Sequence, residues 1–126
     1  MRELEVVCGA ILHEGKYLIA KRGKGVDEGF WEFPGGKMEP NETQQQAIIR
    51  ELKEELEIDV KVIKYLCSVD DIRENLIIHV HAYLCEIVNG QLYLNNHDEV
   101  LFVNKEDLYN YNFQKADKDI LDILNK

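Results

Sequence analysis

Three glutamates at short spacing follow a double-glycine turn. Glu51, Glu54 and Glu55 lie in the segment R-E-L-K-E-E, and Gly35-Gly36 lies ahead of it in W-E-F-P-G-G-K. Residues three and four apart are neighbours on a helix surface, where like charges repel. Carboxylate oxygens, together with a backbone carbonyl that a glycine turn brings close, are the ligands that Mg²⁺ prefers. The spacing therefore predicts a divalent-cation site, with an ordinary solvated helix face as the alternative.

Three basic residues near this turn are candidates for holding phosphate. Lys21 and Arg22 end one predicted strand, and Lys37 directly follows the two glycines. Magnesium sites that keep several waters commonly handle phosphate substrates, and the ion lowers the pKa of bound water so that a nearby carboxylate can take the proton. The residues alone therefore predict a metal ion that acts on a phosphate substrate, with a carboxylate available as general base. Each basic residue taken alone is equally typical of a solvated surface charge.

A helix is predicted to carry the glutamates. Thr43 and Gln46 have the spacing of a capping box, which predicts that the helix starts there. At about 100° per residue, an apolar stripe marks the packing face of this helix. The stripe consists of Ile48, Ile49, Leu52 and Leu56. The three carboxylates fall on another face, so we expect the helix to bury one side and to present its acids on the other.

The rest of the sequence predicts a mixed sheet around this helix. Alternating and β-branched segments indicate strands at 4–12, 17–22, 31–33, 58–69, 76–88, 91–94 and 99–103, and Asn89-Gly90 predicts a hairpin before the segment 91–94. A loop with three glycines covers 23–29, a helical turn follows Asn104, and a last helix spans 117–124. One α/β (α+β) domain over residues 1–126 is expected, with a mixed, largely antiparallel sheet between the two helices.

Composition limits the classes of function. The 126 residues are 45% apolar and 31% charged, which is typical of a globular domain. The formal net charge of −9 argues against a binder of nucleic acid polymers or of membrane surfaces. No apolar run is long enough to span a bilayer, and the first residues do not resemble a secretory signal. Three widely spaced cysteines, Cys8, Cys67 and Cys85, predict reduced thiols in a cytoplasmic protein. Its oligomeric state stays open between monomer and homodimer.

The stretch around the glutamates resembles a known family motif. Gly36, five residues, Glu42, seven residues and then R-E-L-x-E-E-x-x-I resemble the Nudix box, and E-F-P-G-G-K resembles the MutT-like branch of that family. The resemblance implies a Nudix-type α/β/α sandwich. One position departs from the pattern, because Glu57 stands where the box has a glycine. That glycine suits a left-handed helix end, so the departure concerns the local turn, at a cost of about 1 kcal/mol.

The resemblance also implies an activity and a cofactor. MutT-like members hydrolyse a nucleoside triphosphate to the monophosphate and pyrophosphate with Mg²⁺ or Mn²⁺. The implied substrate is of the 8-oxo-dGTP type or of the CTP and 5-methyl-dCTP type, which fits sanitation of the nucleotide pool. The alternative is a Nudix fold that serves as a non-catalytic ligand sensor or interaction module. That alternative predicts a damaged carboxylate set, whereas all three glutamates are present here.

Site roles follow from the resemblance position by position. The implied metal site consists of Gly35, through its carbonyl, Glu51, Glu54, Glu55 and, from a later strand, Glu99. Among the implied catalytic residues, Glu51 acts as ligand or general base, Arg50 orients it through an ion pair, and Glu54 binds the metal. Arg22 resembles the phosphate-contacting arginine of MutT-like proteins, and Lys37 is a second phosphate candidate.

Two segments are candidates for contacting the nucleobase. Strand alternation places His79, His81 and Tyr83 on one face, where they could line a base pocket, although a half-exposed sheet face without a ligand is the alternative. Asp117 matches the position where MutT-like enzymes place an Asn or Asp against the base edge. For Asp117 the alternative is an acid that caps the last helix or lies in its first turn.

Overall fold

A mixed sheet of seven strands forms the centre of the molecule. The computed structural model describes residues 1–95 and 97–126. The strands are β1 (Arg2–His13), β2 (Lys16–Arg22), β3 (Trp31–Glu32), β4 (Gly35–Lys37), β5 (Ile58–Arg73), β6 (Leu76–Gly90) and β7 (His97–Val103). Their order is β3-β2-β1-β6-β5, with β4 paired to β1 and β7 paired to β2. Only the β1–β6 pair is parallel among the described strand pairs, so the largely antiparallel sheet is confirmed.

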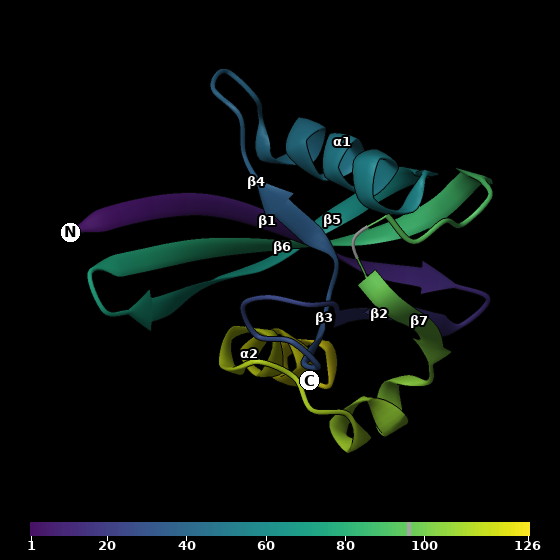
Figure 1. The fold of residues 1–126 in the computed structure, drawn as a ribbon. Coiled ribbons are helices and arrows are strands. Elements are labelled where there is room, and N and C mark those ends of the chain that lie inside the picture. Colours follow the sequence, from purple (N-terminus) through teal and green to yellow (C-terminus); the bar gives the residue numbers. More distant parts are fainter. Residues whose placement is uncertain (96) are drawn as a thin grey trace.

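Two helices lie on opposite faces of this sheet. Helix α1 (Gln44–Leu56) covers one face and α2 (Lys115–Leu124) covers the other, and a short 3₁₀ helix, η1 (Lys105–Asn110), leads into α2 (Figure 1). Each face has its own apolar core, with Leu52 and Leu56 under α1 and Ile120 and Leu121 under α2. The expected three-layer sandwich is therefore confirmed. In the described part of the chain, neither helix is long and apolar enough to cross a membrane.

The start and end of α1 are set by local sequence. Thr43 Oγ1 accepts from the Gln46 amide at 3.1 Å, and Gln46 Oε1 accepts from the Thr43 amide at 2.9 Å, so the predicted capping box is present. At the other end Glu57 adopts φ 58° and ψ 34°, the left-handed conformation, and donates its amide to the Lys53 carbonyl. The turn that a glycine would favour therefore forms with a glutamate in its place.

The buried face of α1 is rotated from the predicted one. Ile49 is 43% exposed, whereas Ala47 is fully buried, so the prediction that Ile49 packs in the core is wrong. At about 100° per residue, Ala47 and Ile49 lie on opposite flanks of the line through Ile48, and either could complete an apolar stripe. The sheet contacts the Ala47 flank. This rotation also carries Glu55 toward the core, because its direction falls between those of Ala47 and Ile48.

Two short segments differ from their predictions. Residues 91–94 form no strand, because the chain runs beside the end of α1 instead, where the Tyr93 amide donates to the Leu56 carbonyl. The predicted hairpin at Asn89-Gly90 is therefore wrong, and Gly90 pairs with Ile58 of β5. Conversely, the glycine turn contains a strand that was not predicted, β4, and its pairing with β1 fixes where the turn lies.

Candidate functional site

The double-glycine segment passes between β1 and α1 with no room for side chains. In the antiparallel β1–β4 pair, Cys8 faces Gly35 and Val7 faces Gly36. A Cβ atom on Gly35 would overlap the Val7 backbone, and one on Gly36 would overlap the carboxylate of Glu51. Glycine at both positions therefore lets the backbone of β4 lie directly against the α1 carboxylate.

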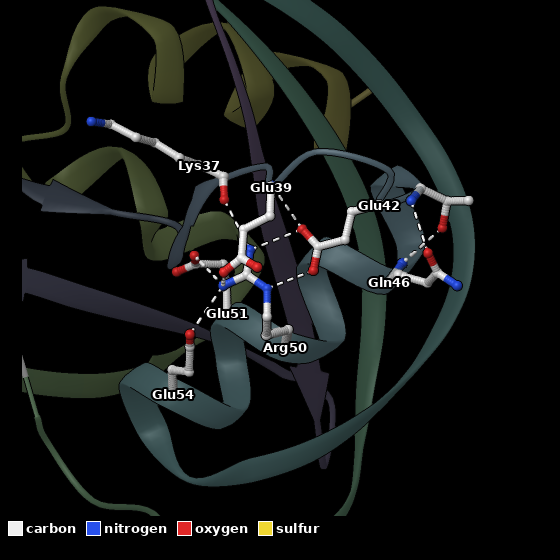
Figure 2. A network of polar contacts seen from close by, with 8 residues as sticks. Lys37, Glu39, Glu42, Gln46, Arg50, Glu51 and Glu54 are labelled. Atoms are coloured by element: carbon white, nitrogen blue, oxygen red, sulfur yellow. Dashed lines mark hydrogen bonds and ion pairs between the residues drawn. The ribbon is translucent and has the colours of Figure 1, made fainter.

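Arg50 lies at the centre of an ion-pair network on the exposed side of α1. Figure 2 shows its guanidinium bonded to Glu42, Glu51 and Glu54 and to the carbonyl of Lys37. The Nη1 atom is 2.8 Å from Glu51 Oε1 and 3.0 Å from the Glu54 carboxylate. The bonds from Arg50, together with the backbone amide of Glu39, lower the pKa of Glu42 to about 2. One guanidinium thus offsets the repulsion among these three acids and Glu39, whose Oε1 lies 3.5 Å from Nη1.

Glu55 lies apart from this network, on the inner side of the helix. Its Oε1 atom is buried and has no hydrogen-bond partner among the described residues. Burial raises the pKa of Glu55 to about 7, and the charges of Glu32 and Glu51 add to that effect, while His97 and the Gly35 amide act in the opposite direction. A buried carboxylate without a partner is costly, and a bound cation would offset that cost. This oxygen therefore fits the ligand set of a divalent ion.

The carboxylates do not form a closed ligand shell by themselves. Within residues 1–95 and 97–126, no group of three or more acidic, histidine or cysteine side chains is arranged to hold an ion. The reason is the division between the two sides of α1: Glu54 has a 52% exposed side chain and contacts Arg50, whereas Glu55 points inward. An ion that took both Glu54 and Glu55 as ligands would have to displace Glu54 from its ion pair with Arg50.

A small polar cavity of about 90 Å³ adjoins Glu55. The cavity is lined by Arg22, Gly23, Lys24, Glu32, Glu55 and His97. Glu32 Oε1 accepts from Arg22 Nη1 at 2.8 Å, and Glu32 Oε2 lies 2.8 Å from His97 Nε2. Burial alone lowers the pKa of His97, but the bond to Glu32 and the charges of Glu32 and Glu55 raise it above its ordinary value. Arg22, Glu32 and His97 thus form a chain of bonded charged groups beside Glu55.

A larger cavity of about 370 Å³ opens on the α2 side of the sheet. Apolar side chains from β1 and β6, including Val6 and Val80, line it, and Asp117 lies in its wall. Burial raises the pKa of Asp117 to about 8, although the Phe33 amide donates to its Oδ1 at 3.2 Å and opposes the effect. An apolar pocket with one buried neutral acid can bind a flat polar ring and read its edge.

Charged residues border this larger cavity. Arg22, Glu32 and Glu55 line both cavities, so the two spaces share a wall. The Arg73 guanidinium also lines the larger cavity and pairs with Asp71 at 2.9 Å and with Asp27 of the 23–29 loop at 3.2 Å. A ligand with a flat ring at Asp117 and a negative chain directed toward Arg22, with a cation between that chain and Glu55, would fit this arrangement.

Comparison with known proteins identifies the family. The NUDIX domain profile matches residues 3–123. The chain belongs to the Nudix family. It is 38% identical over 123 residues to a CTP pyrophosphohydrolase of Escherichia coli, covering 97% of this chain and 91% of that protein. It is 33% identical to a putative 8-oxo-dGTP diphosphatase 2 of Mycobacterium tuberculosis, covering 90% and 82% of the two chains. The solution structure of the Escherichia coli ORF135 protein superposes with a TM-score of 0.87 at 36% identity, covering 99% of this chain and 90% of that one.

The Nudix box residues fall where α1 meets the glycine turn. Glu51 and Glu55 face the turn, whereas Glu54 lies on the solvent side of the helix and is held by Arg50. The expected ion pair between Arg50 and Glu51 is present. Glu99 is exposed on β7 opposite Lys21, and it lines neither of the two cavities. The structure thus brings Glu51 and Glu55 together at the turn and leaves Glu54 and Glu99 outside that group.

The predicted phosphate and base residues of this Nudix protein are divided between the two faces of the sheet. Arg22, Lys37 and Asp117 all line the larger cavity. His79 and His81 lie on the opposite face, where Glu3 and Glu5 accept from their Nε2 atoms at 2.7 Å. The bonds to Glu3 and to Asp70 raise the pKa of His79 to about 9. These histidines are therefore not brought together with Asp117.

Tyr83 shares the face of the two histidines. Its hydroxyl donates to Gln44 at the start of α1, and its ring packs in the core under that helix. Alternation along β6 correctly separated two faces. However, it is Ile78 and Val80, from the other set, that line the cavity. Which face holds the cavity is decided by the packing of α2, which lies far along the chain.

Sequence reasoning missed three residues at this Nudix site. Glu32 is the polar residue between buried Trp31 and Phe33 in W-E-F, and that interruption of an aromatic run was its only signal. His97 shares the segment H-D-E-V with Glu99 but is buried where Glu99 is exposed. Arg73 ends β5 without any local motif. Contacts across many residues of sequence join all three to the site.

Proposed function

We propose that this chain hydrolyses a nucleoside triphosphate to the monophosphate and pyrophosphate in a Mg²⁺-dependent reaction, with Mn²⁺ as a possible substitute. The observation that carries the proposal is the buried Oε1 of Glu55, which has no hydrogen-bond partner among the described residues. It lies in the wall of a cavity of about 370 Å³ whose wall also contains the buried acid Asp117. A ligand-seeking carboxylate and a ring-sized apolar pocket in one space suit a nucleotide whose phosphates meet a metal ion.

The chain's own residues would hold the ion and the phosphates. Glu51, Glu54, Glu55 and the Gly35 carbonyl form the proposed ligand set. The bound ion would supply charge neutralisation and a water of lowered pKa. Glu51 is the proposed ligand or general base, and its bond to Arg50 at 2.8 Å orients its carboxylate. Arg22 and Lys37 line the larger cavity and are the proposed contacts to phosphate oxygens.

The nucleobase is proposed to bind against Asp117. Because its pKa is raised to about 8, this carboxyl is largely protonated at neutral pH, so it can donate through its hydroxyl as well as accept. Such a group suits a base edge that presents both an acceptor and an amino group. Names of the relatives support this class: one is a CTP pyrophosphohydrolase and another a putative 8-oxo-dGTP diphosphatase. We therefore propose CTP, 5-methyl-dCTP or 8-oxo-dGTP as substrate, consistent with nucleotide-pool sanitation.

The setting of the proposed enzyme follows from the same features. Residues 1–126 are proposed to act as one domain. Cys8, Cys67 and Cys85 are unpaired thiols, which supports a cytoplasmic location.

A panel of nucleotides tests the proposal. The protein is incubated with CTP, 5-methyl-dCTP, 8-oxo-dGTP, GTP and ATP in the presence of Mg²⁺ or Mn²⁺, and products are separated by ion exchange. We expect monophosphate and pyrophosphate in equal amounts from at least one of the first three nucleotides. Glu54→Gln serves as the metal-site control and should be nearly inactive. Release of orthophosphate alone, or no turnover with either metal, would refute the hydrolase proposal and favour the non-catalytic alternative.

A further inference from the structure

His97 is buried near the proposed site but has no role yet, because it belongs neither to the helix carboxylates nor to the lining of the larger cavity. It is 9% exposed as a residue, and its side chain is only 3% exposed. It is the first residue of β7, and it lies opposite Arg22 at the end of β2. Its Nε2 atom is 2.8 Å from Glu32 Oε2. An ionised carboxylate only accepts, so Nε2 must carry the hydrogen of this bond.

Glu32 joins His97 to Arg22. One carboxylate oxygen accepts from His97 and the other accepts from Arg22 Nη1, each at 2.8 Å. Arg22 is also bonded through Nε to the carbonyl of Val26 at 3.0 Å. The three side chains come from β7, β3 and β2, and the Glu32 side chain is only 13% exposed. A carboxylate held on both sides can adopt few other orientations, and it fixes its partners in turn.

The Arg22–Glu32–His97 array forms the shared wall of the two cavities. Arg22 and Glu32 line both of them, and His97 lines the small one beside Glu55. The Arg22 side chain is 38% exposed, and an ion pair with such an exposed partner contributes little to stability. A histidine with a buried Nδ1 that has no partner among the described residues contributes even less. The array is thus better explained by what it positions than by what it stabilises.

We propose that His97 is a positioning residue, which holds Glu32 through Nε2 and thereby fixes Arg22 at the wall between the nucleobase and the metal ligands. This inference rests on the proposed function, in which Arg22 contacts the phosphates. His97 itself touches neither base nor phosphate. If Glu32 lost its bond to His97, it would retain a single partner, and Arg22 would lose its fixed orientation toward the ligand.

Two substitutions of His97 separate the roles of its ring nitrogens. In His97→Gln the side-chain amide nitrogen reaches the position of Nε2 and can donate to Glu32. In His97→Asn the amide reaches only the position of Nδ1, so the bond to Glu32 is lost. We expect His97→Gln to keep kcat/KM within about threefold of wild type. We expect His97→Asn to lose about 10- to 100-fold, as is usual for partners of site residues.

The loss in His97→Asn should fall mainly on KM. Arg22 is proposed to hold the phosphates both before and during attack, and loss of such uniform binding raises KM while kcat changes little. The effect of His97→Asn should disappear in a Glu32→Gln background, because the route to Arg22 is already broken there. His13→Asn, at the far end of β1 and outside both cavities, is the matched control and should match wild type.

Several outcomes would overturn the proposal. A loss in His97→Gln with full activity in His97→Asn would assign the effect to Nδ1, and wild-type activity in both variants would remove any role. Equal losses in both variants at unchanged melting temperature would show that the bond to Glu32 is not what matters. If the variants do not fold, long-range ¹H–¹⁵N spectra of the wild-type protein decide, since the proposal requires a protonated Nε2 bonded to a carboxylate.

The test also separates this proposal from the proposed function. Failure of the wild-type protein to hydrolyse any nucleotide would refute the proposed hydrolase activity. The effect of His97 on Arg22 could still be tested, because Arg22 is proposed to contribute to the affinity for CTP. Calorimetry with CTP and EDTA should then show the same ranking, with His97→Asn about 10-fold weaker than His97→Gln. Equal CTP affinity in the two variants would overturn the role of His97, whatever the wild-type activity.

Discussion

The buried acid at the base cavity gives the sharpest prediction. Asp117 is 8% exposed, and burial raises its pKa from 3.8 to about 8. Below pH 3.8 the carboxyl is neutral in both the folded and the unfolded chain. Between 3.8 and about 8 the unfolded chain loses this proton while the folded chain keeps it, so stability falls as pH rises through that window. Above about pH 8 this contribution becomes constant.

The size of the effect follows from the same two values. The ordinary pKa of 3.8 lies roughly three units below pH 7. Each unit corresponds to about 1.4 kcal/mol of unfolding free energy, so the upper limit of the effect is about 4 kcal/mol. Water in the adjoining cavity reduces the desolvation, so we expect about 2 to 4 kcal/mol. Asp117→Asn removes the charge at every pH and keeps an oxygen for the Phe33 amide. The variant should therefore be more stable than wild type at pH 7 and equal to it near pH 4.

Urea unfolding of both proteins between pH 4 and pH 9 measures this difference. Asp119→Asn is the matched control, because Asp119 lies two residues away on the same helix but is exposed. It should leave the pH dependence unchanged. If Asp117→Asn follows the wild-type curve in parallel at all pH values, burial does not hold this carboxyl neutral, and the proposed hydroxyl donor to the base is wrong. The same variant should change the ratio of kcat/KM for CTP and 8-oxo-dGTP by at least about tenfold, since a site built to pair a polar edge discriminates strongly.

Three further substitutions test the carboxylate helix. Glu54→Gln should lower turnover by about 10³-fold and weaken Mg²⁺ binding measured by calorimetry, because it removes a proposed metal ligand. Its melting temperature should stay unchanged, because the Glu54 side chain is 52% exposed and its ion pair with Arg50 contributes little; full activity would show that Glu54 is not a ligand. Arg50→Ala should lower the melting temperature by several degrees in a thermal scan, since Glu42 and Glu51 lose their shared cation; an unchanged value would mean that the network is not stabilising. Glu57→Gly should raise the free energy of unfolding in urea by about 0.5 to 1 kcal/mol, because it relieves a left-handed non-glycine residue; no gain would show that the turn carries no strain.

Features encoded in neighbouring residues could be predicted from the sequence. The capping box at Thr43 and Gln46 fixes the start of α1 through bonds within three residues. Most strands follow from their own alternation, and the family motif brings the glycine turn and the glutamates together. The strand at the turn, β4, was not predicted because glycine has a low strand propensity. It pairs with β1 at a place where side chains on Gly35 and Gly36 would overlap neighbouring atoms.

Features decided by distant packing could not be predicted. Ala47 and Ile49 are equivalent as flanks of a helix stripe, and the sheet chooses between them. The same holds for β6, where α2 determines that Val80 rather than His81 faces the cavity. The bond between Glu32 and His97 spans 65 residues of sequence, and no spacing rule reaches that far. The sequence thus predicts which residues of a helix or strand share a face, but only the folded structure shows what packs against each face.

The rotation of α1 explains how one helix carries so many acids. If Glu55 lay on the same face as Glu51 and Glu54, Arg50 could pair with all three carboxylates. No carboxylate oxygen would then be left without a partner to bind an ion. Instead Arg50 neutralises Glu42, Glu51 and Glu54, and Glu55 is carried inward beyond its reach. Among the described residues, the charge of His97 acts on the inner carboxylate and lowers its pKa, but Glu32 already engages His97. A divalent ion would therefore gain most at Glu55, where it relieves desolvation, and least at Glu54, where it must compete with an existing ion pair.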